Sequence, residues 1–238
     1  MSLKIILIVL ASLFTGLFLF ARVTKGGLYG LLTKIVASLG FMAIAICGAV
    51  LYFPSVSSLF VVFGLLFGLV GDIVLDLKVI YKEHNDIYLN AGMLSFGLGH
   101  VCYFVALFTY VSNHIMYKSS SLPMYIPILV GVGVAVVLSL GVLFSTKMLK
   151  LDFGKFFFQS VGYTILLTNL SAISICLATF YGIGFLWLFG MGATLILVSD
   201  LILSLNYFGG KPDDKLLVFL NHLIYYAGQI LIATFLLF

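Results

Sequence analysis

The stretch GLVGDIVLDLK, residues 68–78, closes a long apolar run that begins near residue 56. It places Asp72, and Asp76 one helical turn later, where the interior of a lipid bilayer would lie. An ionisable side chain at the centre of a membrane helix costs about 3 kcal/mol on insertion scales, so it is a functional candidate by default. The apolar pattern around it recurs along the chain and decides the class of fold.

The composition is that of a membrane protein. The chain has 238 residues, of which 63% are hydrophobic and 8% are charged, and its mean hydropathy is +1.26. Apolar runs of about 20 residues predict membrane-spanning α-helices. An outer-membrane barrel would instead show short strands of alternating polarity.

We expect an all-α, polytopic transmembrane helical bundle of about eight spans, forming a single integral membrane domain over residues 1–238. The apolar runs that define the spans cover residues 3–20, 28–50, 56–76, 87–110, 124–144, 156–179, 184–206 and 216–238. The loops between them are too short to hold a soluble domain. No internal repeat indicates an inverted-repeat transporter.

The basic residues predict an orientation. Nine of them fall at the loops that follow odd-numbered spans, namely Arg22, Lys25, Lys78, Lys82, Lys147, Lys150, Lys155, Lys211 and Lys215. Lys4 and Lys118 fall on the other side. The positive-inside rule then places the odd loops in the cytoplasm and both termini away from it. The net charge of +4 therefore indicates membrane lipids as partners, not nucleic acid.

Polar side chains inside the spans group by depth. At about 1.5 Å rise per residue, one layer lies roughly 6–10 Å from the cytoplasmic ends and contains Lys34, Asp72, Tyr163, Asp200 and His222. A second layer, about 20 Å deep, contains His100, Asn169 and Gln229. His222, Tyr225 and Gln229 share one helix face at this spacing. The layers predict a polar cavity in the cytoplasmic half of the membrane.

Plainer interpretations exist for several of these residues. Lys34 could form a structural ion pair with either nearby aspartate. His100 and His222 could be hydrogen-bonded core residues, and Asp76 is close enough to the end of its span to be a solvated helix end. The three isolated cysteines, Cys47, Cys102 and Cys176, fit neither a metal nor a disulfide pattern.

Buried carboxyl groups in different surroundings can divide the roles of general acid and general base. The sequence has no motif for a metal, a nucleotide or a serine nucleophile. From the residues alone, the interpretation is either a membrane-embedded acid/base site or a proton-coupled transporter.

A set of motifs then narrows the choice. They are LLTKIVAS (31–38), GDIVLDL (71–77), GMLSFGLGHVCYF (92–104), GATLILVSDLILSLNYF (192–208) and YYAGQILIA (225–233). In this order and at these helix positions, they resemble the lysoplasmalogenase family, the YhhN-like multi-pass membrane proteins. The resemblance implies an ether hydrolase without a cofactor or metal. Such an enzyme cleaves the vinyl-ether bond of a lysoplasmalogen to a fatty aldehyde and glycerophospho-ethanolamine or -choline.

The resemblance also implies site residues. Asp72 and Asp200 match the aspartates of the family and are expected to form the acid and base pair, in either assignment. His100 and Tyr103 match a second motif and could position water or the hemiacetal. Lys34 could bind the lipid phosphate or act on one aspartate.

Further side chains are expected to line the same pocket. Tyr226 and Gln229 match the last motif, and Tyr163 comes from the polar layer. His222 lies outside the motifs and receives no role. Ile35 stands where the family often has proline, which affects the expected local shape of the helix and not the charge of Lys34.

Two rivals use the same residues. One is a proton-coupled transporter or lipid-binding membrane protein, because intramembrane carboxylates often relay protons. The other is a scaffold stabilised by an ion pair of Lys34. The expected partners are a lysophospholipid substrate and membrane lipids. The membrane would be the plasma membrane in a bacterium and the endoplasmic reticulum in a eukaryote.

Overall fold

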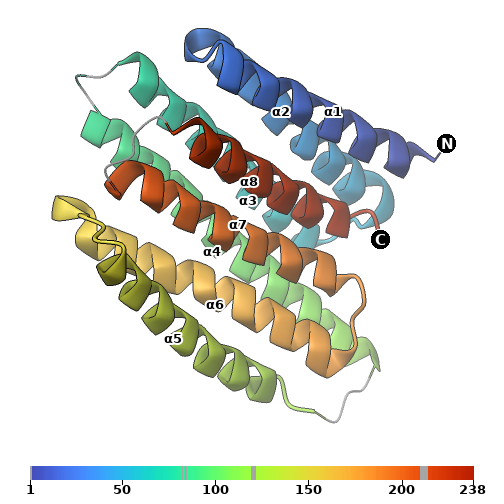
Figure 1. The fold of residues 1–238 in the computed structure, drawn as a ribbon. Coiled ribbons are helices and arrows are strands. Elements are labelled where there is room, and N and C mark those ends of the chain that lie inside the picture. Colours follow the sequence, from blue (N-terminus) through green and yellow to red (C-terminus); the bar gives the residue numbers. More distant parts are fainter. Residues whose placement is uncertain (1, 82, 84, 119–121, 210–213) are drawn as a thin grey trace. The chain divides into compact units, whose positions relative to one another are not determined.

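A computed structural model describes residues 2–81, 83, 85–118, 122–209 and 214–238. Within these ranges the secondary structure is entirely helical (Figure 1). The α-helices are α1 (Leu3–Thr24), α2 (Gly27–Cys47), α3 (Val56–Ile80), α4 (Asn85–Lys118), α5 (Tyr125–Met148), α6 (Phe157–Tyr181), α7 (Leu186–Phe208) and α8 (Lys215–Phe235). Two short segments join them, the π-helix η1 (Gly48–Tyr52) after α2 and the 3₁₀-helix η3 (Gly154–Phe156) before α6.

The predicted all-α polytopic fold is confirmed. Eight helices in the described part of the chain are long and apolar enough to cross a bilayer, which fits a multi-pass membrane protein. Most helices begin within a few residues of the predicted spans. The largest difference is α4, which extends to Lys118, well beyond the predicted end at residue 110. The tail after residue 110 is polar, so hydropathy marks only the apolar part of a helix that continues past it.

The chain forms two compact units, and their boundaries fall inside helices α4 and α8. The first unit contains Met1–Ala106 and Ile232–Phe238, and the second contains Leu107–Leu231. In the first unit α1 lies beside α2, and α2 packs against α3. In the second unit α6 packs against both α5 and α7.

In the first unit, two glycines allow α3 and α4 to approach closely. A Cβ atom at Gly99 of α4 would lie 2.9 Å from the backbone oxygen of Gly64 on α3. One at Gly64 would overlap the buried ring of Tyr103. Small residues at such a crossing bring helix backbones together, which is the main source of packing energy between helices in lipid. The crossing holds α3, which carries Asp72, against α4.

In the second unit, α5 contacts α6 through one stripe of small residues. Its buried positions, Pro127, Gly131, Ala135 and Ser139, recur every four residues, so they share one helix face. The hydroxyl groups of Ser139 and Thr168 are 2.7 Å apart and form a hydrogen bond between the helices. No residue of α5 beyond Ser139 is buried.

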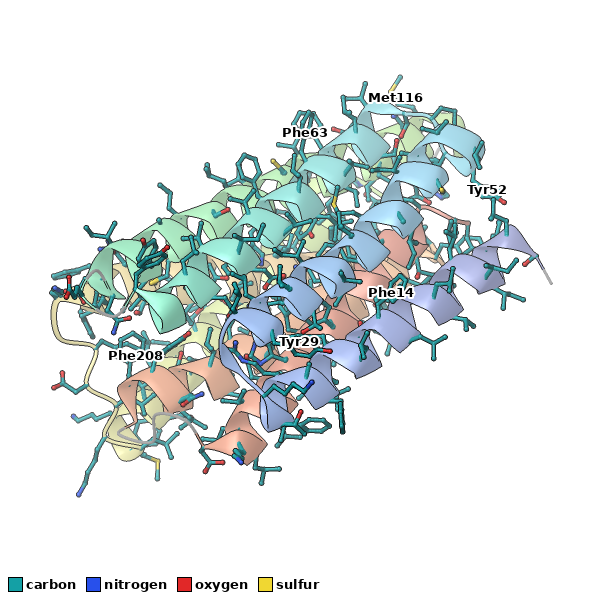
Figure 2. The ribbon with its side chains drawn as sticks, turned by 90° about the horizontal axis from the view of Figure 1, so that it is seen from above. Phe14, Tyr29, Tyr52, Phe63, Met116 and Phe208 are labelled. Carbon is teal, nitrogen blue, oxygen red and sulfur yellow. The ribbon has the colours of Figure 1, made fainter. Side chains whose placement is uncertain are left out.

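Large apolar side chains are exposed on both units. Phe63 of the first unit and Met116 of the second point away from the helices that carry them (Figure 2). Such an exposed apolar surface is consistent with membrane spans, because lipid chains would cover it. The predicted orientation stays a prediction, and two of its lysines, Lys82 and Lys211, lie outside the described residues.

The glycine crossing gives a test of the fold. We expect Gly99→Ala to lower the free energy of unfolding by about 1–3 kcal/mol, because the new methyl group meets backbone that cannot rotate away. Gly97→Ala is the matched control on the same helix, because its Cβ would meet nothing within 4 Å. It should be neutral or slightly stabilising. Denaturant titration in detergent measures both, and equal effects of the two variants would contradict the crossing.

Candidate functional site: a buried charge network and an aspartate–tyrosine pair

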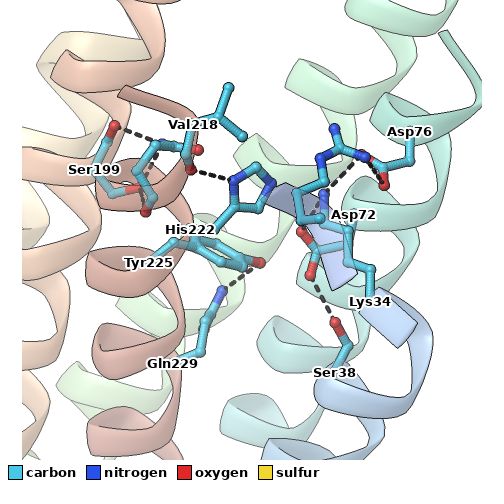
Figure 3. Close-up of polar contacts among 11 residues, drawn as sticks. Lys34, Ser38, Asp72, Asp76, Ser199, Val218, His222, Tyr225 and Gln229 are labelled. Atoms are coloured by element: carbon cyan, nitrogen blue, oxygen red, sulfur yellow. Dashed lines mark hydrogen bonds and ion pairs between the residues drawn. The ribbon is translucent and has the colours of Figure 1, made fainter. Parts of the chain in front are cut away.

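The first unit contains an ion cluster centred on Lys34 of α2 (Figure 3). The Lys34 ammonium nitrogen lies 3.3 Å from Asp72 Oδ1 and 3.2 Å from Asp76 Oδ1. All three side chains are about 5% exposed or less. One cation therefore bridges two carboxylates on the neighbouring helix α3.

Two further side chains complete this cluster, which we call the charge network (Arg22, Lys34, Ser38, Asp72 and Asp76). The guanidinium of Arg22 on α1 lies 3.0 Å from Asp76 Oδ2. The hydroxyl of Ser38 donates to Asp72 Oδ2 at 2.8 Å. With all four charged groups ionised, the network is neutral. Neutrality and mutual hydrogen bonds are what make burial of several charges tolerable.

Helix periodicity explains the arrangement. Lys34 and Ser38 are four residues apart on α2, and Asp72 and Asp76 are four apart on α3, so each pair lies on one helix face. Lys34 and Asp76 meet at 3.2 Å, and Ser38 and Asp72 meet at 2.8 Å. The order of the contacts is that of two antiparallel neighbours: the earlier residue of α2 meets the later residue of α3.

Two interpretations from the sequence are corrected here. Asp76 is not a solvated helix end, because it is 4% exposed and contacts both Lys34 and Arg22. Arg22 is not a loop residue, because α1 continues to Thr24 and places Arg22 in its last turn. The structural ion pair that was one interpretation of Lys34 is present, and it involves both aspartates instead of one.

Asp200 belongs to the second unit and has a different partner. The hydroxyl of Tyr163 on α6 donates to Asp200 Oδ2 at 2.9 Å. Both side chains are half-buried. Two residues of the predicted polar layer thus meet within this unit, as Lys34 and Asp72 do within the first. Asp72 and Asp200, the predicted catalytic pair, belong to different units.

Next to Asp200, a reciprocal set of hydrogen bonds joins α7 to α8. The amide nitrogen of Asn221 donates to the backbone oxygen of Ser199 at 2.8 Å and to its hydroxyl at 2.9 Å. The Ser199 hydroxyl donates to the backbone oxygen of Asn221 at 3.1 Å. Ser199 and Asn221 are both buried. This contact fixes the register of α7 against α8 one residue away from Asp200.

The predicted stripe on α8 is present and buried. His222 Nδ1 donates to the backbone oxygen of Val218 at 2.7 Å, because a carbonyl can only accept. The amide of Gln229 donates to the hydroxyl of Tyr225 at 3.0 Å. The ring of Tyr226 is fully buried and meets that of Tyr225 edge to face, with 5.2 Å between centroids. These contacts belong to α8 itself.

His100 and Tyr103 lie together on α4 in the first unit. His100 Nδ1 donates to the backbone oxygen of Phe96 at 2.5 Å. The two rings meet edge to face with 5.9 Å between centroids. Both side chains are buried, and Tyr103 fills the space beside Gly64. His100 is therefore a hydrogen-bonded core residue, as one of the two interpretations of the sequence had it.

Sequence reasoning missed Arg22, Ser38, Ser199 and Asn221 as partners. A signal existed for Ser38, which follows Lys34 by one helical turn, and for Ser199, which precedes Asp200 in the quoted SD motif. Neutral polar residues are common in membrane helices. These signals therefore do not distinguish a serine that hydrogen-bonds to a neighbouring helix from one that does not.

Metal-ligating residues do not gather in the described part of the chain. No group of three or more His, Cys, Asp or Glu side chains there could hold a metal ion. Cys47, Cys102 and Cys176 are half-buried free thiols. The chemistry that the described side chains offer is proton transfer, charge stabilisation and anion binding by Lys34 or Arg22.

The fold and the charge network define a multi-pass helical membrane protein with ionisable groups buried between its helices. The sequence model of the YhhN family matches residues 29–236. The chain therefore belongs to the YhhN family, which includes lysoplasmalogenases. Comparison with curated proteins and comparison with solved structures each gave no match.

Neutrality of the charge network is testable. We expect Lys34→Met to lower the free energy of unfolding by about 3–5 kcal/mol, because it leaves a buried carboxylate without its cation. In the double variant Lys34→Met/Asp72→Asn, the Arg22–Asp76 pair remains and the site is neutral again. Its loss should be smaller than the sum of the two single losses. Denaturant titration in detergent gives all three values, and additive losses would contradict the network.

Proposed function

We propose that this protein is a membrane-embedded hydrolase that cleaves the vinyl-ether bond of lysoplasmalogens by acid/base catalysis. The observation that carries the proposal is Asp72, a buried carboxylate held by Lys34 and Ser38, in a chain of a family that includes lysoplasmalogenases. The products are a fatty aldehyde and glycerophospho-ethanolamine or -choline.

The reaction needs an acid first. In the proposed mechanism a carboxylic acid protonates the β-carbon of the enol ether, and the double bond becomes an oxocarbenium ion. Water then attacks the cationic carbon and loses a proton to a base, which gives a hemiacetal. The hemiacetal loses its hydroxyl proton as the ether oxygen is protonated and leaves, so that the aldehyde and the glycerol hydroxyl are released. Glycoside hydrolysis uses two carboxyl groups around a cation of the same kind.

The contacts of Asp72 support a role for its charged form. Both oxygens of Asp72 act as acceptors, Oδ1 toward the Lys34 ammonium and Oδ2 toward the Ser38 hydroxyl. An ammonium group has no lone pair to accept a hydrogen bond from a protonated acid. We therefore propose that Asp72 stabilises the oxocarbenium ion and, by elimination, that Asp200 supplies the proton.

Other residues of the charge network support substrate binding. Lys34 and Arg22 are the cations of this cluster, and a lipid phosphate is an anion that either can hold. Lys34 contacts both aspartates, so a phosphate drawn to it would lie within reach of Asp72. Tyr163, hydrogen-bonded to Asp200, is proposed to orient that side chain, and Tyr226 and Gln229 of α8 to contact the lipid.

The test is aldehyde release from a lysoplasmalogen by the purified full chain in detergent, with the saturated ether analogue as blank. We expect Asp72→Asn and Asp200→Asn each to reduce turnover at least about 100-fold, the scale of general acid–base catalysis. Asp152→Asn is the matched control, because this exposed carboxylate accepts a hydrogen bond from Gly154 in the loop before α6. It should keep full activity.

Two outcomes would contradict the proposal. One is a folded wild type that releases no aldehyde with either headgroup. In that case, proton-coupled transport would be measured in liposomes. The other is full turnover by folded Asp72→Asn or Asp200→Asn protein, which would remove that aspartate from the mechanism.

A further inference from the structure

The second unit has an apolar groove that the proposed catalysis does not use. Its volume is about 500 Å³, within the range of roughly 300–1,000 Å³ of ordinary ligand pockets. One wall is the end of α5 from Val137 to Thr146, continued by Leu149 and Leu151, and the other is the turn of α7 around Leu201 and Leu205. It is nearly all apolar.

The groove exists because α5 stops packing against α6. The buried stripe of α5 ends at Ser139, and the groove-lining positions of this helix continue from Val137 to Thr146. From Val137 to Leu149 the wall runs about 18 Å along the helix axis. This is close to half of the roughly 30 Å hydrocarbon core, which is the depth that one acyl chain covers.

The segment after α5 forms the end of the groove and is fixed to α7. The backbone nitrogen of Asp152 donates to the backbone oxygen of Phe208 at 3.0 Å. The rings of Phe153 and Phe208 lie with centroids 4.6 Å apart. The end of the groove is therefore held in place by a backbone hydrogen bond and an aromatic contact.

Lysines stand at this end. Lys147 lies in the last turn of α5, next to the lining residue Thr146, and Lys150 lies between the lining residues Leu149 and Leu151. Both side chains are exposed. Lys150 has a φ of 52°, a left-handed conformation uncommon for residues other than glycine. The acidic group of this segment is Asp152, which accepts from Gly154.

We infer that this groove binds an anionic phospholipid of the surrounding leaflet, with one acyl chain along α5 and the phosphate at Lys147 and Lys150. The occupant is inferred from charge complementarity. An apolar groove about as long as one acyl chain ends beside two exposed lysines, Lys147 and Lys150. Basic groups at the ends of membrane helices bind anionic headgroups in this way. By the positive-inside prediction these lysines face the cytoplasm, where anionic lipids are concentrated.

Gly141 provides a selective test. It lines the groove, and a Cβ added there would meet no protein atom within 4 Å. Gly141→Leu should therefore fill the groove without disturbing the helix packing. Gly133→Leu is the matched control, because Gly133 is on the same helix, is equally open and does not line the groove. Both changes raise helix propensity by the same amount.

The experiment is native mass spectrometry of the purified full chain, titrated with phosphatidylglycerol and with phosphatidylcholine of the same acyl chains. We expect wild type and Gly133→Leu to retain phosphatidylglycerol preferentially and Gly141→Leu to lose this retention. Lys147→Gln and Lys150→Gln should each weaken phosphatidylglycerol binding by about fivefold, the worth of one cation near an anionic lipid. Neither should change phosphatidylcholine binding.

Three results would overturn the inference. The first is equal retention of the two lipids by wild type, and the second is equal loss in Gly133→Leu and Gly141→Leu. The third is displacement of phosphatidylglycerol by a zwitterionic lysolipid at equal concentration, which would make the groove a site for the substrate chain. None of these depends on aldehyde release, so failure here is distinguishable from failure of the proposed function.

Discussion

The physical constraint on which the first unit depends is that charges buried away from water must neutralise one another. Lys34 contacts two of these carboxylates, at 3.3 Å from Asp72 and 3.2 Å from Asp76. A single ammonium cannot balance two carboxylates, and Arg22 on α1 supplies the second positive charge at 3.0 Å from Asp76. Three helices are therefore held in one register by charge. A slide of α2 by one turn along α3 would remove Lys34 from between the two carboxylates, and leaving a buried charge without its partner costs about 3–5 kcal/mol.

This dependence reaches beyond the family-matched segment. The match covers residues 29–236, and Arg22 precedes it. The family-matched segment thus contributes one cation, Lys34, and two carboxylates. Helix α1 contributes Arg22, the second cation, which makes the network neutral. The first helix, which otherwise buries only a narrow stripe of residues around Ala11, Phe18 and Ala21, has an electrostatic role that its apolar sequence does not reveal.

The eight spans were predictable because hydropathy reports directly on the length of chain that can lie in lipid. Lys34 and Asp72 were predictable for the same reason, since a charge in an apolar run stands out. Arg22 and Asp76 were misplaced because both lie within a turn of a helix end, where a few residues decide whether a side chain is counted in the helix or the loop. Ser199 and Asn221 were missed because neutral hydrogen-bonding residues leave no contrast in composition. The groove beside α5 depends on where one helix stops packing against the next, which the pattern of a single helix does not contain.

The charge network and the proposed catalysis place opposed demands on Lys34. For stability, its ammonium should stay between Asp72 and Asp76, because both carboxylates are buried and both lie within 3.3 Å of it. For substrate binding, it should turn toward a phosphate. The network contains the means to reconcile the two, because Arg22 still neutralises Asp76 and the Ser38 hydroxyl still donates to Asp72 when Lys34 turns away. In the proposed mechanism, Asp72 then keeps only the neutral Ser38 hydroxyl as its partner. The oxocarbenium ion that forms next to it would supply the positive charge that Lys34 no longer provides. Binding of the lipid headgroup and stabilisation of the transition state would thus be coupled through one side chain.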